Sequence, residues 1–202
     1  MKAGEIKLEA LSVMNILLDA RPDYRYMDGY LCESKYQKYL LNMDESIKRA
    51  LDIISSQNVL EEKSFMASEC EYLTKNGYIV LSLNQIQDYK SIKKVVDVKD
   101  KINNVRFDVV AKKLIIYSQS ADDIIIVYYP RVIVPENITN DTVIDLPDSL
   151  ARIIPYYIKY DLYQEDEPNL AMVAKSQFYT LLENYSLENL SDEFYIEKVY
   201  EV

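Results

Sequence analysis

The spacing of apolar residues changes twice along this chain of 202 residues, and this change limits the folds that the chain can adopt. From about residue 5 to residue 58, apolar positions recur every three or four residues, as on one face of an α-helix. From 59 to 134, short β-prone runs alternate with polar breaks, and after residue 146 the helical spacing returns. The sequence therefore predicts an α+β fold in which an antiparallel β unit is inserted into a helical body.

We expect about four helices in this body, two before the β unit and two after it. The first covers residues 5–18 and ends before Arg21-Pro22, because a residue that precedes proline is disfavoured in the α region. The second begins near residue 34 and continues to residue 54. Between these two helices, the stretch 23–33 is rich in Tyr and Asp and is predicted to be a loop.

The second helical pair is predicted from a stretch that contains two prolines. A helix is expected over residues 148–164, with a kink at Pro155, because proline removes one backbone donor. The acids at 165–167 are expected to form a turn. Pro168 then suits the first position of the last helix, which is expected to end near Asn184.

The β unit carries one strong local signal. Asn76-Gly77 lies between two β-prone runs, and this dipeptide favours a two-residue hairpin because both of its positions accept positive φ. Together these patterns predict the following domains: a helical body at 1–58 and 146–185, an inserted antiparallel β domain at 59–134, a connector at 135–145, and an acidic C-terminal tail at 186–202.

The composition excludes several classes of enzyme. The chain has no His, which excludes His-dependent triads and most catalytic zinc sites. It has three Gly in all, so it lacks the glycine-rich loops of P-loop and Rossmann nucleotide enzymes. The two Cys residues form no ligand or disulfide framework. We therefore expect a protein that is not an enzyme and binds no cofactor or metal.

The charge and the hydropathy pattern limit the partners that we expect. The net charge of −10 argues against broad electrostatic capture of nucleic acid, since such binding depends on basic groups. Glu5, Lys7 and Glu9 interrupt the apolar stripe of the N-terminal segment, where a signal peptide would be continuously apolar. No other apolar run approaches membrane length, so we expect a soluble protein with no membrane partner.

Two charged clusters have both a functional and a structural interpretation. The acids at 165–167 could bind a metal ion, but carboxylates before a helix are also stabilised by the helix dipole, and we favour this structural role. A basic segment could meet DNA or an acidic partner, although its alternation with apolar residues favours the solvated face of a sheet. This segment consists of Lys90, Lys93, Lys94, Lys99, Lys101, Arg106, Lys112 and Lys113.

Two apolar and aromatic groups are interface candidates. Tyr156, Tyr157 and Tyr160 follow Pro155 at helical intervals, which suits either a core or a subunit contact. In the tail, FYIEKVY alternates apolar and charged residues and is predicted to be a strand. This strand could add to a neighbouring subunit's sheet, dock on its own domain or stay disordered. Its candidate contact residues are Phe194, Ile196, Val199 and Tyr200.

The order of these elements resembles that of the head-to-tail connector (adaptor, or neck-ring) proteins of tailed bacteriophages, over about residues 5–184. In that family a tyrosine-proline motif commonly ends the β segment. A leucine-proline pair then precedes a helix with an internal proline and aromatic residues, and an acidic turn precedes the last helix. The corresponding motifs in this sequence are Tyr128-Tyr129-Pro130, Leu146-Pro147, Pro155-Tyr156-Tyr157 and Glu165-Asp166-Glu167-Pro168. The chain departs from the family pattern in its Tyr-rich loop around 24–30 and in its tail from Ser186.

The resemblance implies a virion structural protein made in the host cytoplasm and located at the head-to-tail junction. Identical subunits would form a ring, often dodecameric in the family, that docks below the portal protein and extends the DNA channel toward the tail. Its other partner would be the tail or the next neck ring, and genomic DNA would pass through the lumen without sequence-specific binding. The alternatives are another virion ring, such as a tail-completion or tail-tube-associated protein, and an intracellular binding module or a metal enzyme that uses carboxylates alone.

Overall fold

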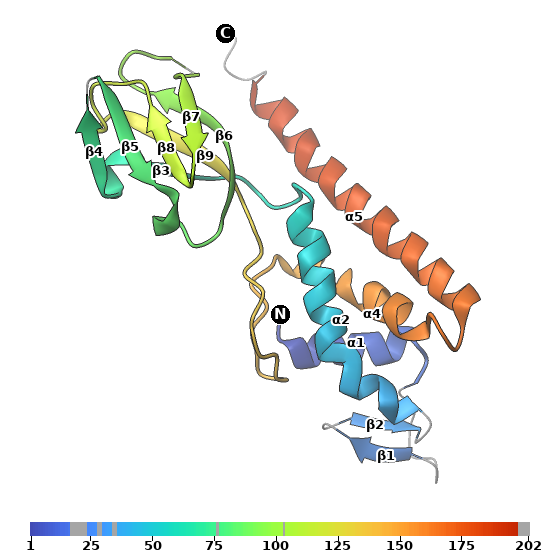
Figure 1. The fold of residues 1–202 in the computed structure, drawn as a ribbon. Helices are drawn as coiled ribbons and strands as arrows, with labels where there is room; N and C mark the ends of the chain where they lie inside the picture. The colour runs from blue at the N-terminus through green and yellow to red at the C-terminus, as the bar shows by residue number, and fades with distance from the viewer. Residues whose placement is uncertain (17–23, 28–29, 34–35, 76, 103, 198–202) are drawn as a thin grey trace. The chain divides into compact units, whose positions relative to one another are not determined.

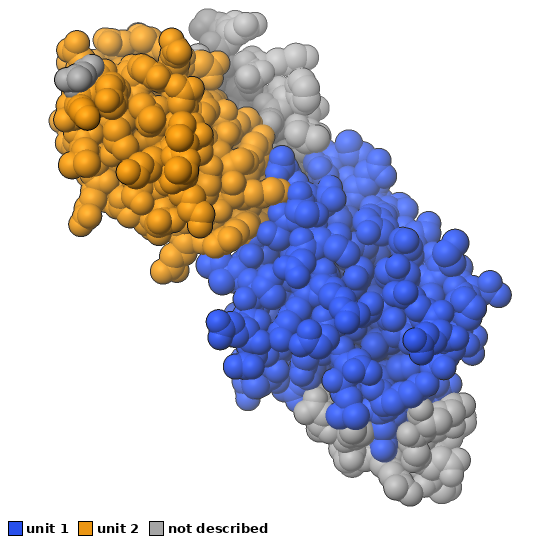
Figure 2. Space-filling model, viewed as in Figure 1, with its two compact units in different colours: residues 1–59, 132–202 blue, residues 60–131 orange. Residues whose placement is uncertain are grey.

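The computed structural model describes residues 1–16, 24–27, 30–33, 36–75, 77–102 and 104–197, with the backbone alone at 24–27, 30–33 and 188–197. The chain divides into two compact units, which Figure 2 shows in different colours. Unit 1 contains residues 1–59 and 132–202, and unit 2 contains residues 60–131. The α+β fold expected from the sequence is confirmed, with helices in unit 1 and two antiparallel sheets in unit 2 (Figure 1).

Unit 1 is built mainly from helices. Its elements in chain order are α1 (Ala3–Val13), β1 (Tyr24–Met27), β2 (Tyr30–Glu33), α2 (Gln37–Ser56), α3 (Asp148–Ala151), α4 (Ile154–Tyr163) and α5 (Pro168–Glu197). Helix α4 packs against α1, α2 and α5, so it forms the centre of this unit. The helices α1, α2 and α5 bury residues at the three- and four-residue spacing that the sequence predicts. In α2 these are Leu40, Met43, Ile47, Ala50, Leu51 and Ile54.

Polar contacts also fix the position of α1. Lys7 is 2% exposed, and its Nζ lies 2.9 Å from Oδ1 of Asp44 on α2 and 2.9 Å from Oδ1 of Asn140 in the connecting segment. At the end of α1, Lys159 donates to the carbonyl of Val13 and Tyr163 donates to the carbonyl of Met14. These two donors from α4 satisfy carbonyls that have no partner within α1.

Unit 2 contains two antiparallel sheets. Its elements are β3 (Lys63–Met66), η2 (Ala67–Glu69), β4 (Tyr72–Lys75), β5 (Tyr78–Ser82), η3 (Leu83–Gln85), β6 (Tyr89–Asp97), β7 (Phe107–Val110), β8 (Lys113–Ile116) and β9 (Ile124–Pro130). One sheet has the strand order β3-β9-β6 and the other β4-β5-β8-β7. Alternate residues of both sheets meet in one core, as the period of two requires. Its most buried members include Ile79, Leu114, Ile116, Val95, Ile124 and Ile126.

Two hairpins of the four-stranded sheet turn in two residues. Lys75 pairs with Tyr78, so Asn76-Gly77 connects β4 to β5 and the hairpin prediction is confirmed. Gly77 has a φ of +83°, which is the conformation that glycine accepts most easily. The hairpin between β7 and β8 turns at Ala111 (φ 48°) and Lys112 (φ 61°), where the sequence offers neither Gly nor Asn.

Three local expectations are wrong. The stretch 23–33 is not a simple loop, because β1 and β2 pair as an antiparallel hairpin within it. The helix expected at 148–164 is divided into α3 and α4, and Pro155 lies in the first turn of α4, where its missing N–H removes no helical hydrogen bond. The last helix does not end near Asn184, since α5 continues to Glu197.

The continuation of α5 has a simple sequence reason. The stretch 185–197 contains no Gly or Pro, and Leu187, Leu190 and Phe194 repeat at helical spacing. The predicted strand at the start of FYIEKVY is therefore wrong as far as Glu197, and residues 198–202 lie outside the described part of the chain.

Candidate interaction surfaces

One of the tyrosines after Pro155, Tyr157, lies between helices of unit 1. Tyr157 is 6% exposed, and its ring centre lies 5.2 Å from that of Phe178 on α5. Burial, followed by the charge of Asp161, raises the pKa of Tyr157 to about 12. This residue packs in the core between α4 and α5, so it offers little surface to an outside partner.

Tyr156 and Tyr160 keep part of their surface exposed. The Tyr160 ring meets that of Tyr157 edge to face at 5.6 Å, and Nζ of Lys175 on α5 lies 5.1 Å from the Tyr160 ring centre. Both tyrosines are half-buried, so of the three candidates on α4 these two retain surface for a contact. Among the tail candidates, Phe194 and Ile196 lie on α5 where the backbone alone is described, and Val199 and Tyr200 lie outside the described residues.

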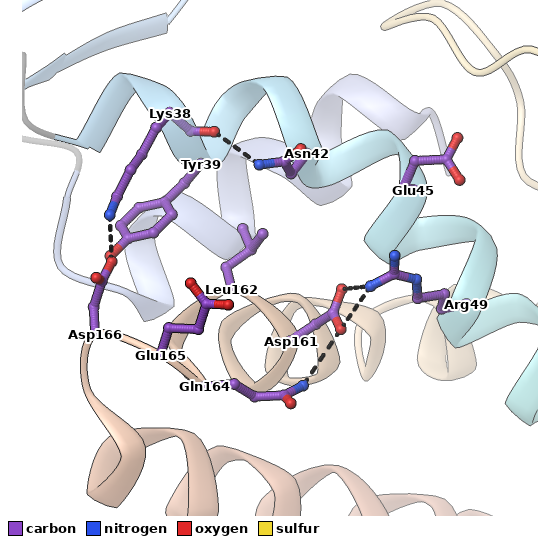
Figure 3. Close-up of a pocket in the computed structure, with 10 residues that line it drawn as sticks. All are labelled: Lys38, Tyr39, Asn42, Glu45, Arg49, Asp161, Leu162, Gln164, Glu165 and Asp166. Atoms are coloured by element: carbon purple, nitrogen blue, oxygen red, sulfur yellow. Dashed lines mark hydrogen bonds and ion pairs between the residues drawn. The ribbon is translucent and has the colours of Figure 1, made fainter.

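A polar groove of about 450 Å³ lies between α2 and the end of α4 (Figure 3). Ion pairs cross it at two places. At one place, Lys38 and Tyr39 from α2 both donate to Oδ2 of Asp166. At the other, Nη1 of Arg49 lies 3.0 Å from each carboxylate oxygen of Asp161. The groove is therefore bridged by its own side chains.

Both aspartates of this groove accept hydrogen bonds from α2. Hydrogen bonds from Lys38 and Tyr39 hold the pKa of Asp166 below its usual value. Asp161 also accepts a hydrogen bond of 2.7 Å from Oγ of Ser46, a buried residue of α2. With these donors both carboxylates are engaged in fastening α2 to α4, and neither is placed as a free base or nucleophile.

Two residues of the acidic turn at 165–167 make contacts within the chain. Asp166 takes part in the contact just described, and the backbone N–H of Glu167 donates to the carbonyl of Tyr163 at the end of α4. In the part of the chain that the structure describes, no three His, Cys, Asp or Glu side chains gather in a group that could hold a metal ion. The turn thus joins α4 to α5.

The predicted basic segment is spread over both sheets of unit 2. Lys93 on β6 forms an ion pair with Glu62, and the guanidinium of Arg106 lies 4.7 Å from the ring centre of Tyr117. Lys99 and Lys101 are exposed in the turn after β6, whereas Lys113 is exposed on β8. Strand β6 belongs to the three-stranded sheet and β8 to the four-stranded sheet. The solvated-face interpretation fits the exposed members of the set.

Two surfaces that sequence reasoning missed carry exposed apolar residues. On unit 2, Leu73 is 73% exposed and Val110 is 58% exposed on the four-stranded sheet. On unit 1, α5 exposes large apolar residues over several turns. These are Leu170 (45%), Met172 (69%), Val173 (56%), Tyr179 (42%), Leu181 (37%) and Leu187 (57%). In the sequence, the small number of charged residues in α5 before Glu188 could have indicated the surface on unit 1.

No family model matches the chain, and no curated protein sequence matches it significantly. Among the described residues, none of the helices combines the length and the apolar character needed to cross a bilayer.

Proposed function

We propose that this protein is a head-to-tail connector of a tailed bacteriophage, a ring subunit that docks below the portal and continues the DNA channel toward the tail. One observation carries the proposal. The chain has a β unit inserted into a helical unit. It also has the sequence motifs that occur in the connector family where these elements begin and end. Here Tyr128-Tyr129-Pro130 closes β9, Leu146-Pro147 precedes α3, and Pro168 opens α5.

The distribution of charge supports this role. Residues 60–131 hold 11 of the 23 Lys and Arg residues and 10 of the 33 Asp and Glu residues, so the acidic excess of the chain belongs to unit 1. A subunit beside a DNA channel must let the phosphates pass, and an acidic surface does not bind them. A ring also needs two different contact faces on each subunit, and two units of different character can supply them.

Cryo-electron microscopy of the tailed particle encoded by the same genome tests the proposal. We expect a ring of this chain directly below the portal, and we expect its gene to lie among those for the portal and capsid proteins. A ring at the far end of the neck or around the tail tube would favour the alternative of a tail-completion or tail-tube-associated protein. Absence of the chain from the particle would overturn both virion roles.

A calorimetric titration addresses the remaining alternative of a carboxylate-only metal enzyme. We expect no saturable binding of magnesium, calcium or zinc, because Asp161 and Asp166 are engaged by cations of the chain itself. A site near one ion per chain with micromolar affinity would contradict this expectation.

A further inference from the structure

Among the described strands of unit 2, β4 and β7 form the two edges of the four-stranded sheet (Figure 1). All four residues of β4 are exposed, and so are the last three residues of β7. A strand at the edge of a sheet directs backbone N–H and C=O groups outward, where another strand can pair with them. In the three-stranded sheet, by contrast, Val105 already donates to the outer edge of β6, at the carbonyl of Val95.

The backbone groups that point outward from each edge follow from the hydrogen bonds within the sheet. Bonded and non-bonded pairs alternate along two antiparallel strands, so one bond in each ladder fixes the alternation. Two such bonds are Leu83 N–H to the Lys112 carbonyl, at 2.9 Å, and Tyr117 N–H to the Arg106 carbonyl, at 3.0 Å. Carried through the register of the sheet, they direct the backbone groups of Thr74 on β4 and Val109 on β7 outward.

The side chains at the two edges complement each other. On the outer face of the sheet, each edge carries one exposed apolar residue and one exposed charged residue. On β4 these are Leu73, which is 73% exposed, and Lys75. On β7 they are Val110, which is 58% exposed, and Asp108, whose Oδ2 accepts a hydrogen bond from the hydroxyl of Tyr117. The two edges therefore carry opposite charges.

We propose that β4 of one copy of this chain pairs with β7 of a second copy, so that the four-stranded sheet continues from subunit to subunit. This inference rests on the proposed ring, because it names a contact between neighbouring subunits. The sheet has an even number of antiparallel strands, so β4 and β7 run in opposite directions. A second copy placed beside the first in the same orientation therefore meets it with antiparallel strands.

The side chains favour one register for this pairing. Two registers oppose the outward backbone groups over most of both strands and keep the outer face continuous. In the first, Thr74 lies opposite Val109 of the second copy. The side chains on the outer face then form two pairs, Leu73 with Val110 and Lys75 with Asp108. Apolar pairs and pairs of opposite charge directly across two strands both stabilise a sheet.

The second register is shifted by two residues and is less favourable. It places Leu73 opposite Asp108, so that an apolar side chain faces a charge. It also places Lys75 opposite Arg106, and like charges directly across two strands destabilise a sheet. The proposed contact therefore has the first register.

This pairing covers both edges of every copy. A two-fold pairing of two β4 strands would leave β7 uncovered in each copy, with Val109 45% exposed and Val110 58% exposed. Because β4 and β7 differ, the proposed contact is head to tail, and its repetition produces a closed ring or an open chain of copies.

A disulfide between the two edges tests this contact. Leu73 and Val110 would form a non-hydrogen-bonded pair with Cα atoms about 4.5 Å apart, which suits a disulfide. The variant carries Leu73→Cys and Val110→Cys in a chain with Cys32→Ser and Cys70→Ala. Copper phenanthroline added at the highest soluble concentration should give a ladder of linked dimers, trimers and larger species. Within one folded copy the two positions lie three strand spacings of about 4.8 Å apart, too far to be linked.

The matched control replaces Val110→Cys by Val98→Cys, an exposed valine in the turn after β6, and should give no ladder. Equal ladders from both chains would show accidental collisions and would overturn the contact. A linked dimer of the chain with Leu73→Cys alone would show that β4 pairs with itself. Absence of any linked species would exclude the contact.

An exchange of charges provides a second readout. Lys75→Asp places two acids opposite each other and should reduce the ladder about threefold. Addition of Asp108→Lys restores a pair of opposite charges and should recover the ladder. Lys99→Asp makes the first change at an exposed site outside both edges and should leave the ladder unchanged. Equal losses from Lys75→Asp and Lys99→Asp would contradict the proposed register.

The result remains separable from the proposed function. Loss of the ladder in a protein that still occupies the neck of the particle would overturn this contact alone. A ladder formed by a protein that is absent from the particle would overturn the connector function and leave the contact standing.

Discussion

At the scale of single residues, Lys7 is unusual because it is a charged residue that is buried in the core of unit 1. Its side chain is 2% exposed and lies against Asp44 and Asn140. The contact with Asp44 is an ion pair that is poorly aligned for a hydrogen bond. We expect Lys7→Met to lower the free energy of unfolding of unit 1 by about 3 kcal/mol, since it leaves the buried carboxylate oxygen of Asp44 without its cation. Urea unfolding followed by helical circular dichroism measures this change.

A double-mutant cycle separates the ion pair from simple packing. Lys7→Met combined with Asp44→Leu should recover a large part of the lost stability, because neither charge then remains unpaired. Lys48→Met is the matched control, as Lys48 pairs with Glu45 in an exposed contact on α2, and it should change stability by less than about 0.5 kcal/mol. Additive effects of the first two variants would show that the pair does not act as a unit.

Asp88 should make the stability of unit 2 decrease at acidic pH. Burial raises the pKa of Asp88, but hydrogen bonds from Lys63 and Tyr128 outweigh this effect and hold it below its usual value. The unfolded chain therefore takes up the proton first as the pH falls, so the stabilisation is present at neutral pH and is lost below about pH 4. Urea midpoints should fall between neutral pH and about pH 3, and Asp88→Asn should make this fall smaller. An unchanged pH profile in the variant would show that Asp88 makes no such contribution.

At the scale of elements, the two tight hairpins of the four-stranded sheet predict opposite mutational effects. A Cβ at Gly77 would meet no atom within 4 Å, so the cost of a larger residue comes from the positive φ and not from a clash. Gly77→Val should destabilise unit 2 by about 1 to 3 kcal/mol, whereas Gly77→Asn should be tolerated better. Loss of the β signal with retention of the helical signal in circular dichroism is the expected result, and an unchanged thermal midpoint would contradict it.

A mutation in the hairpin that turns at Ala111-Lys112 should change the stability of unit 2 in the opposite direction. Lys112 adopts a φ of 61°, which costs a residue with a Cβ about 1 kcal/mol relative to glycine. Lys112→Gly should therefore stabilise unit 2 by less than this amount in the same melting experiment, because glycine also gives the unfolded chain more conformational freedom. If both hairpin variants shift stability in the same direction, backbone conformation is not the cause.

At the scale of the whole molecule, residues 183–187 of α5 keep their side chains at least partly exposed. Leu182 is the last described residue of α5 that is buried, and Leu187 is 57% exposed. Deletion of residues 186–202 should therefore leave both units folded and shift the thermal midpoint little. If the connector proposal holds, particles that carry the truncated chain should have weakly attached or missing tails. Electron micrographs and melting curves measure the two effects.

Two results would contradict this prediction in different ways. Failure of the truncated chain to fold would show that residues 186–202 belong to the core of unit 1. Normal tailed particles would show that this segment makes no assembly contact.

The candidate surfaces were less predictable from the sequence than the elements. The helical spacing around Tyr157 identified an apolar face but not its partner, and the packing of α4 on α5 assigned this face to the core of unit 1. The exposed apolar residues of α5 and of the four-stranded sheet were not predicted. Whether Leu73 or Val173 is buried depends on which elements meet, and residues far apart in the chain decide that.

Local patterns by themselves determined the two structural periods, the insertion of strands between helices and the turn at Asn76-Gly77, because each depends on neighbours within a few residues. Only the tertiary structure decided that Lys7 is enclosed by Asp44 and Asn140 and that α5 leaves large apolar residues exposed. These features depend on contacts between distant segments, whose free energies come from burial and pairing rather than from local conformational preference.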